Sequence, residues 1–213
     1  QARQPLEQAA AMLQPWRELE SENAADLHFE AGTIAYWRGA IAYRLSDLDQ
    51  AEKHWRDYLA AALRLQAAAP DDPRGKVELA AALGNLGTLA EGRDQFASAL
   101  DYFQQSAAIR REQVQGTGDR ANLDLANSLS WISRIHNNLG QPAQAWIALE
   151  QALQLIAQLR RETDDNQLLQ RETNLHYLLG MNSIYRGDLP RARLELDRAL
   201  ELARQDVHND PTQ

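Results

Sequence analysis

Five histidines are the side chains of this chain best suited to proton transfer or metal binding: His28, His54, His136, His176 and His208. A metal site on a helix needs two ligands on one face, three or four residues apart. No two of these histidines have that spacing. His136 and His176 fall at inward-facing positions of consecutive predicted helices, where they could approach each other, but ordinary packing explains them better than a metal pair. We predict no metal site.

Two pairs of adjacent carboxylates, Asp71–Asp72 and Asp164–Asp165, are a second candidate for acid–base chemistry. Neighbours in an exposed turn lack the enclosed pocket that separates the pKa values of a catalytic pair, whereas helix capping accounts for them well. The segment 116–119 has the composition of a phosphate-binding loop, but it follows a helix and no Lys-Ser/Thr pair comes after it. The sequence therefore predicts no catalytic residue and no cofactor, and the chain is expected not to be an enzyme.

Composition excludes further classes. The 213 residues carry a net charge of -8, which disfavours nucleic acid and anionic membrane surfaces as direct partners. There is no cysteine, so a disulfide framework and a thiolate nucleophile are excluded. No apolar run approaches the roughly 18 residues of a membrane span, so no membrane insertion is expected. Localisation stays open, with the cytoplasm slightly favoured over the periplasm.

An alanine recurs along the chain at a nearly constant interval. The four anchors, Ala51, Ala99, Ala145 and Ala192, lie 48, 46 and 47 residues apart, and a large apolar residue follows each after four positions. That spacing defines one face of a helix. A small residue precedes each anchor by twelve positions and a turn-forming or small polar residue by five: Gly39 and Ser46, Gly87 and Asp94, Ser133 and Gly140, Gly180 and Gly187. Each unit is therefore predicted to be a helix, a tight turn and a second helix, and the fold class to be all-α.

These units give predicted boundaries. First helices are expected at 25–45, 75–92, 120–139 and 166–186, and second helices at 48–69, 95–115, 142–162 and 189–206. Residues 1–22 repeat the second-helix pattern through Ala2, Leu6 and Ala9, so the chain is interpreted as a fragment of a longer protein that begins inside a repeat. The prediction is about nine helices in a single array over 1–213, with a truncated repeat at 1–22 and repeats at 23–73, 74–119, 120–165 and 166–213.

The second unit carries a family resemblance. It has a large residue, a Leu-Gly pair, then small and aromatic residues at fixed offsets: Leu83, Leu86, Gly87, Ala90, Phe96, Ala99, Phe103 and Ser106. This pattern resembles the tetratricopeptide repeat (TPR), in a long-repeat variant with a period of about 47 residues in place of 34, as in bacterial multidomain signalling proteins. The resemblance implies a right-handed superhelical solenoid of antiparallel helix hairpins. The register of the first unit is open by one residue.

The resemblance further implies that the first helices line a concave groove. Amides, aromatics and arginines gather at the positions that would face it, whereas the second repeat offers small residues with Glu91. The predicted binding residues are Tyr36, Tyr43, Arg44, Asn127, Ser130, Arg134, Asn137, Asn138, Asn174, Tyr177, Met181 and Tyr185.

Such a groove suits a protein or peptide ligand, because carboxamides bond a peptide backbone in both directions and tyrosine offers a rigid surface with a polar tip. The leading hypothesis is a non-catalytic protein-interaction module, a scaffold or signalling part of a larger bacterial protein. The alternative is a sensor whose array changes pitch when a peptide signal binds. Leu6, Leu13 and Trp16 at one end, and the outward side of the last helix at the other, lack a stacking neighbour, so a homo-oligomer through these terminal helices is a further expectation.

Overall fold

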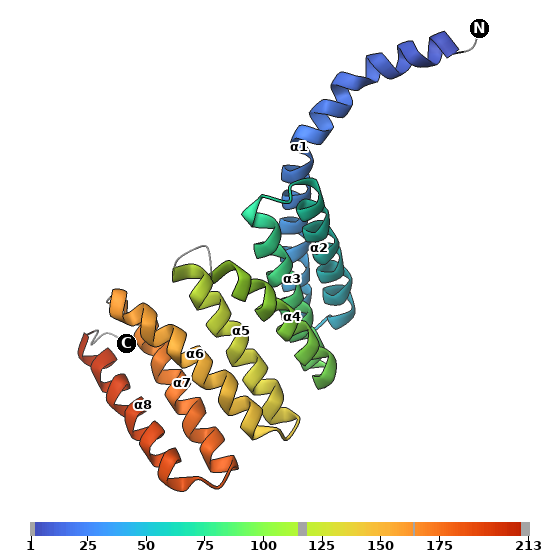
Figure 1. Ribbon diagram of the computed structural model, residues 1–213. Helices are drawn as coiled ribbons and strands as arrows, with labels where there is room; N and C mark the ends of the chain where they lie inside the picture. Colours follow the sequence, from blue (N-terminus) through green and yellow to red (C-terminus); the bar gives the residue numbers. More distant parts are fainter. Residues whose placement is uncertain (1–2, 115–118, 164, 210–213) are drawn as a thin grey trace. The chain divides into compact units, whose positions relative to one another are not determined.

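The computed structural model describes residues 3–114, 119–163 and 165–209, with the backbone alone for residues 3–22, 119, 162 and 207–209. Within these ranges the chain is all-α, with eight helices and no strand (Figure 1). The fold class predicted from the sequence is confirmed. The helices are α1 (Arg3–Arg44), α2 (Leu48–Ala68), α3 (Pro73–Gly92), α4 (Phe96–Val114), α5 (Asp119–Asn138), α6 (Pro142–Glu162), α7 (Asn166–Tyr185) and α8 (Leu189–Asn209).

The expected count of about nine helices is wrong by one. The predicted second helix of a truncated repeat at 1–22 and the predicted first helix at 25–45 form one helix, α1, of 42 residues. The segment 21–24, where a turn was expected, reads Ser-Glu-Asn-Ala and contains neither glycine nor proline. Nothing there removes a backbone donor or favours a left-handed turn, so the helical hydrogen bonds continue through it.

The chain divides into two compact units, residues 1–89 and 90–213, and the division falls inside α3. In the first unit, α1 and α2 form a hairpin. In the second unit, α4 to α8 lie side by side in chain order, and each packs on the next (Figure 1). The core of the second unit is one continuous apolar cluster, and its most deeply buried large side chains are Phe103, Ile135, Leu149, Ile156 and Leu179.

The anchor alanines are buried as predicted, because each lies where two helices approach closely. Ala51, Ala99 and Ala145 are 0% exposed and Ala192 is 3% exposed. The small residue twelve positions earlier meets the second helix of its own hairpin. A Cβ placed on Gly39 would lie 2.3 Å from Cδ1 of Trp55. Glycine is required there because the indole occupies the space of any larger side chain.

The four predicted turns share one backbone conformation. Ser46, Asp94, Gly140 and Gly187 all have positive φ, at 61°, 57°, 70° and 75°. In each turn the following residue donates its N–H to a carbonyl five residues back; Asp47 N to Ala42 O at 2.9 Å is one example. This is the Schellman closure of a helix, in which a left-handed residue satisfies the last free carbonyls. The turn residues singled out by the repeat therefore end the first helices.

Aspartates of the linkers cap the helices that follow, as predicted. Asp165 accepts a hydrogen bond from Gln167 N at 2.8 Å, and Asp72 accepts one from Arg74 N at 2.9 Å. The guanidinium of Arg74 also binds both carboxyl oxygens of Asp72 and reaches Asp26 of α1 at 2.8 Å. These hydrogen bonds, first from the side chain and then from the backbone of Arg74, lower the pKa of Asp72. The neighbouring Asp164, the linker segment 116–118 and the last linker at 210–213 lie outside the described residues.

Candidate functional site

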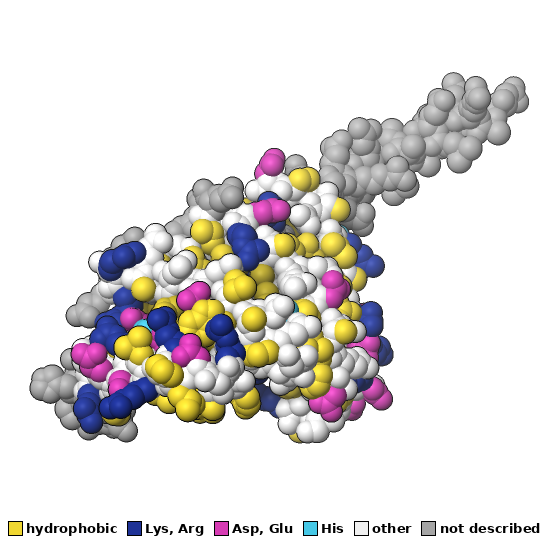
Figure 2. Space-filling model, turned by 60° about the horizontal axis from the view of Figure 1, so that its bottom comes forward, with side chains coloured by type: hydrophobic (Ala, Val, Ile, Leu, Met, Phe, Trp, Pro, Cys, Tyr) yellow, Lys and Arg dark blue, Asp and Glu magenta, His cyan; other side chains and the backbone are white. Residues whose placement is uncertain are grey.

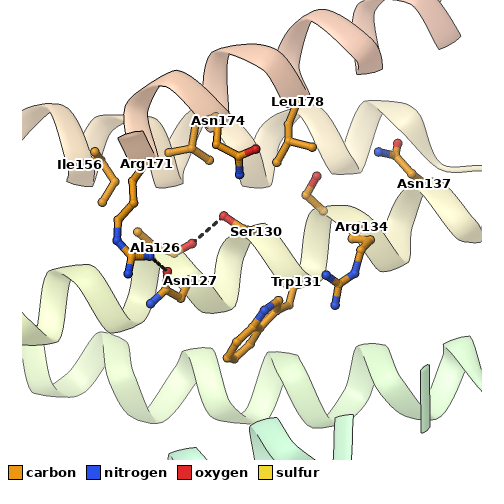
Figure 3. A pocket seen from close by; sticks show the side chains of 12 residues that line it. Ala126, Asn127, Ser130, Trp131, Arg134, Asn137, Ile156, Arg171, Asn174 and Leu178 are labelled. Carbon is orange, nitrogen blue, oxygen red and sulfur yellow. Dashed lines mark hydrogen bonds between the residues drawn. The ribbon is translucent and has the colours of Figure 1, made fainter. Parts of the chain in front are cut away.

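A hollow of about 350 Å³ opens between α5 and α7, the first helices of the third and fourth predicted repeats (Figure 3). Polar side chains of both helices point into it, and Ile156 of α6 lines it together with apolar residues of α5 and α7. The lining side chains used below are Asn127, Ser130, Trp131 and Arg134 of α5, and Arg171 and Asn174 of α7. Asn137 lines the far end of the hollow.

Two hydrogen bonds join α5 to α7 along this hollow. Arg171 donates to the amide oxygen of Asn127 at 2.7 Å, and Asn182 donates to the amide oxygen of Asn137 at 2.8 Å. Asn127 and Asn137 also line the hollow, so their amides could instead bond the peptide groups of a ligand, because each offers both a donor and an acceptor. The Ser130 hydroxyl donates to the carbonyl of its own helix at Ala126 O, 3.0 Å away, so both lone pairs of its oxygen stay available to a donor (Figure 3).

The two arginines of the hollow differ in their partners. Arg134 forms a two-pronged ion pair with Glu91, with Nε 2.6 Å from Oε1, so its charge is neutralised. Within the described part of the chain, Arg171 donates a hydrogen bond to the amide of Asn127 and forms no ion pair with a carboxylate. A guanidinium held only by an amide favours a ligand carboxylate, because carboxylates accept two parallel hydrogen bonds from the planar fork. Arg171 thus adds a positive charge to the hollow, on a chain of net charge -8.

Five of the predicted binding residues line this one hollow: Asn127, Ser130, Arg134, Asn137 and Asn174. Sequence reasoning missed Arg171 and Trp131. Arg171 lies three residues before Asn174, one helical turn further toward the N-terminus of α7, so a longer reading of the same face would have found it. Trp131 carries no polar signal for a groove, because its ring packs on Phe103 of α4 with centroids 5.3 Å apart.

The other predicted residues of this unit lie outside the hollow. Tyr177 is 49% exposed and borders a second hollow of about 610 Å³ between α7 and α8, which Asn174 also lines. Asn138 and Tyr185 are exposed, and Met181 is half-buried. Asn174 is therefore the one predicted residue shared by both hollows.

In the first unit, the structure places two predicted tyrosines on the hairpin partner α2. The ring of Tyr36 meets Tyr58 edge to face, with centroids 5.7 Å apart, and Tyr43 packs on Trp55 at 5.3 Å. Both tyrosines remain half-buried, whereas Arg44 at the end of α1 is exposed. These aromatic pairs stabilise the α1–α2 hairpin, each by about 0.5–1.5 kcal/mol beyond its buried area.

The two histidines predicted to face inward have separate partners. His136 Nδ1 lies 2.7 Å from Gln141 Oε1, while His176 Nδ1 lies 2.7 Å from Glu195 Oε2 of α8. Glu195 also binds Arg191, and the neighbouring Glu172 binds Arg160 of α6. This network joins α6, α7 and α8. No group of three or more histidines, cysteines and carboxylates arranged to hold a metal occurs in the described ranges.

On the face shown in Figure 2, basic and acidic side chains are interspersed, with exposed hydrophobic residues between them. Across the described helices, none combines the length and apolarity that a membrane span requires. A mixed surface of this kind carries no extended field of one sign.

No protein-family model and no curated protein matches the sequence. Solved structures do match. BtubC (BKLC) from P. vanneervenii is 14% identical with a TM-score of 0.50, over 93% of this chain and 89% of its own. The MamA protein is 15% identical with a TM-score of 0.48, over 85% of this chain and 96% of its own. A DHF58 filament is 17% identical with a TM-score of 0.49, over 88% of this chain and 97% of its own. At such identities the likeness is one of fold, that of an all-helical repeat protein.

Proposed function

We propose that this protein is a non-catalytic interaction module that binds a peptide or protein segment in the hollow between α5 and α7. The supporting observation is that side chains from two consecutive first helices face one cavity. Asn127 and Asn174 lie there with Arg171, whose guanidinium suits a ligand carboxylate. The volume of about 350 Å³ fits two or three side chains of a ligand. The long-period TPR variant, the single array and the origin in a larger bacterial protein belong to the same proposal.

The partner that this site fits best is an extended segment with an acidic side chain. Its carboxylate would replace Asn127 as the partner of Arg171, and the freed amide would bond the ligand backbone. Continuation of the segment past Asn174 would bring it to Tyr177 and the hollow beside α8. In this proposal Tyr177 is a second contact for the ligand, at the edge of the site.

One observation favours a regulatory function at the same site. The hydrogen bonds Arg171–Asn127 and Asn182–Asn137 join α7 to α5. A ligand that competes for the amide of Asn127 or Asn137 weakens these hydrogen bonds and changes how the two repeats pack. This is how the array would respond to a peptide signal under the sensor hypothesis. Hydrogen exchange of α7 separates the two functions: a scaffold protects α7 on binding, whereas a sensor exposes the α5–α7 contact.

The test begins with a random twelve-residue peptide library displayed on phage and selected on the full chain, with the Arg171→Glu variant used for counter-selection. We expect selected peptides to share an acidic residue and to lose about 10-fold or more in affinity with Arg171→Ala by calorimetry. Arg198→Ala is the matched control, because Arg198 is an exposed arginine that pairs with Glu201 of its own helix. Peptides that bind Arg171→Ala as tightly as the wild type would refute this assignment of the site.

A further inference from the structure

The strongest unexplained feature outside the hollow is an apolar stripe along α1. Ile34, Trp37 and Ile41 are 53%, 59% and 58% exposed, and Leu27 is 61% exposed. Large hydrophobic side chains in a continuous row on a helix surface mark a contact that the isolated chain does not make. The stripe lies on the described part of α1, in the first unit.

Comparison with the equivalent positions of another repeat indicates which kind of element covers an apolar row of this type. Relative to the small residue of each unit, Ile34, Trp37 and Ile41 correspond to Ser128, Trp131 and Ile135 of α5. Ser128 and Ile135 are 0% exposed. Their cover comes from α4, whose Phe103 packs on Trp131 and whose Arg110 donates to Asp124 O at 2.6 Å. The row on α1 therefore needs an antiparallel helix with a second-helix sequence.

The segment with that sequence is the N-terminal half of α1 itself. Leu6 stands four residues after Ala2, as Phe103 stands four after Ala99. A turn near residues 21–24 would let this segment fold back on its own chain, but α1 is one continuous helix through that point. A continuous helix carries its N-terminal half away from its own stripe. The segment can then reach only the stripe of another copy.

The heptad spacing of α1 supports this independently. Leu6, Leu13, Glu20, Leu27, Ile34 and Ile41 follow one another at intervals of seven, and Ala9, Trp16 and Trp37 hold the positions three residues after a heptad start. A sustained repeat of this kind over a continuous helix is the pattern of a two-stranded coiled coil. Residues 3–22 belong to this pattern by their residue types and their helical backbone alone.

We propose that two copies of this chain associate through antiparallel α1 helices, each covering the apolar stripe of the other. The α4–α5 register, transferred by the repeat, sets Leu6 opposite Trp37 and Leu13 opposite Glu30 of the second copy. Read from either copy, this pairing is centred between Ser21 and Glu22. It maps onto itself under a twofold rotation, as a closed dimer requires.

The same register brings the heptad positions of the two helices into layers. Trp16 stands opposite Leu27, Ala9 opposite Ile34, and Glu20 opposite Asn23 at the centre, while Leu13 stands opposite Glu30. Polar residues thus fill the central layer and one side of the Leu13–Glu30 layer, and polar positions of this kind fix the register of such a pair. The transferred repeat register and the heptad layers agree, although one comes from contacts in the second unit and the other from the sequence of α1.

Sedimentation equilibrium on the full chain tests the dimer. We expect a species of twice the 24.0 kDa chain mass, and Ile34→Glu is expected to raise its dissociation constant about 10- to 100-fold while far-UV circular dichroism stays unchanged. Ile147→Glu is the matched control, because Ile147 is 54% exposed and lies on α6 of the second unit. The proposal is overturned if the chain stays monomeric at high micromolar concentration, or if Ile34→Glu leaves the dissociation constant of the dimer unchanged.

Cross-linking tests the register without relying on a destabilised variant. The chain has no cysteine, so Leu6→Cys and Trp37→Cys variants are each single-cysteine proteins. A mixture of the two treated with a short bismaleimide is expected to give a covalent dimer, whereas neither variant alone should. A variant that carries both Leu6→Cys and Trp37→Cys is the control. If its two cysteines are linked only within one chain, residues 3–20 fold back on their own chain and the proposed dimer is wrong.

Discussion

At the scale of single residues, Gly39 and Gly32 of α1 allow the effect of close packing on stability to be distinguished from the effect of helix preference. A Cβ on Gly39 would lie 2.3 Å from Trp55, whereas a Cβ on Gly32 would meet its nearest neighbour, in Tyr58, at 3.4 Å. We expect Gly39→Ala to destabilise the protein by about 1–3 kcal/mol through overpacking against the rigid indole. Gly32→Ala should be neutral or stabilising by up to about 1 kcal/mol, because alanine favours the helix. Urea unfolding of both variants checks the pair; equal effects would mean that the indole yields.

The carboxylate of Asp72 gives the pH dependence at this scale. Its pKa is lowered below the ordinary value of 3.8 by hydrogen bonds from the side chain and backbone of Arg74. A folded-state pKa below the unfolded one gives stability that is present above pH 3.8 and is lost as the pH falls through the lower value. Carbon-detected NMR titration of Asp72 should therefore show a midpoint below 3.8. In the Arg74→Gln variant the midpoint should rise, and an unchanged midpoint would contradict the assigned cause.

At the scale of elements, the core side chains of α6 carry the stability of the stack. Leu149 is 1% exposed inside the apolar cluster, whereas Ile147 on the same helix is 54% exposed. We expect Leu149→Ala to cost about 2–5 kcal/mol, since the cavity it leaves lies between packed helices. Ile147→Ala should cost well under half as much. Thermal melts of the two variants measure the difference, and similar losses would place the core of this unit elsewhere.

The element scale also shows how far the repeat pattern reached. The predicted helices at 48–69, 75–92, 142–162 and 166–186 differ from α2, α3, α6 and α7 by no more than two residues at either end. Ser46, Asp94, Gly140 and Gly187 were singled out by position, and all four adopt the left-handed conformation that ends a helix. Local turn chemistry and apolar spacing act over a few residues, so the sequence displays them directly.

At the scale of the whole molecule, binding and stability should separate. Arg134→Glu and Tyr177→Ala are expected to weaken the binding of a selected peptide by roughly 1–4 kcal/mol each, because arginine and aromatic anchors dominate binding energies. The melting temperature of Tyr177→Ala should stay near that of the wild type, since Tyr177 is exposed, whereas Arg134→Glu also removes the ion pair with Glu91 and is expected to lower it. Calorimetry paired with thermal melts checks both expectations. Unfolding by Tyr177→Ala, or unchanged affinity of both variants for the peptide, would move the interaction surface away from these helices.

The sequence by itself determined the unit of this protein: a helix, a left-handed turn and a second helix, repeated with buried alanines at fixed places. It also placed Asn127, Arg134 and Asn174 on the faces that line one hollow. These features follow from periodicity and turn preference, which are properties of neighbouring residues.

Only the tertiary structure decided which side chains of different helices meet. Arg134 pairs with Glu91, forty-three positions away, and Arg171 of α7 donates to Asn127 of α5, forty-four positions away. It also decided that residues 3–44 form one helix where the repeat pattern predicted two. Such outcomes depend on the offset between stacked helices and on the balance between a turn and a continued helix. Those are sums over many distant contacts, which no local pattern contains.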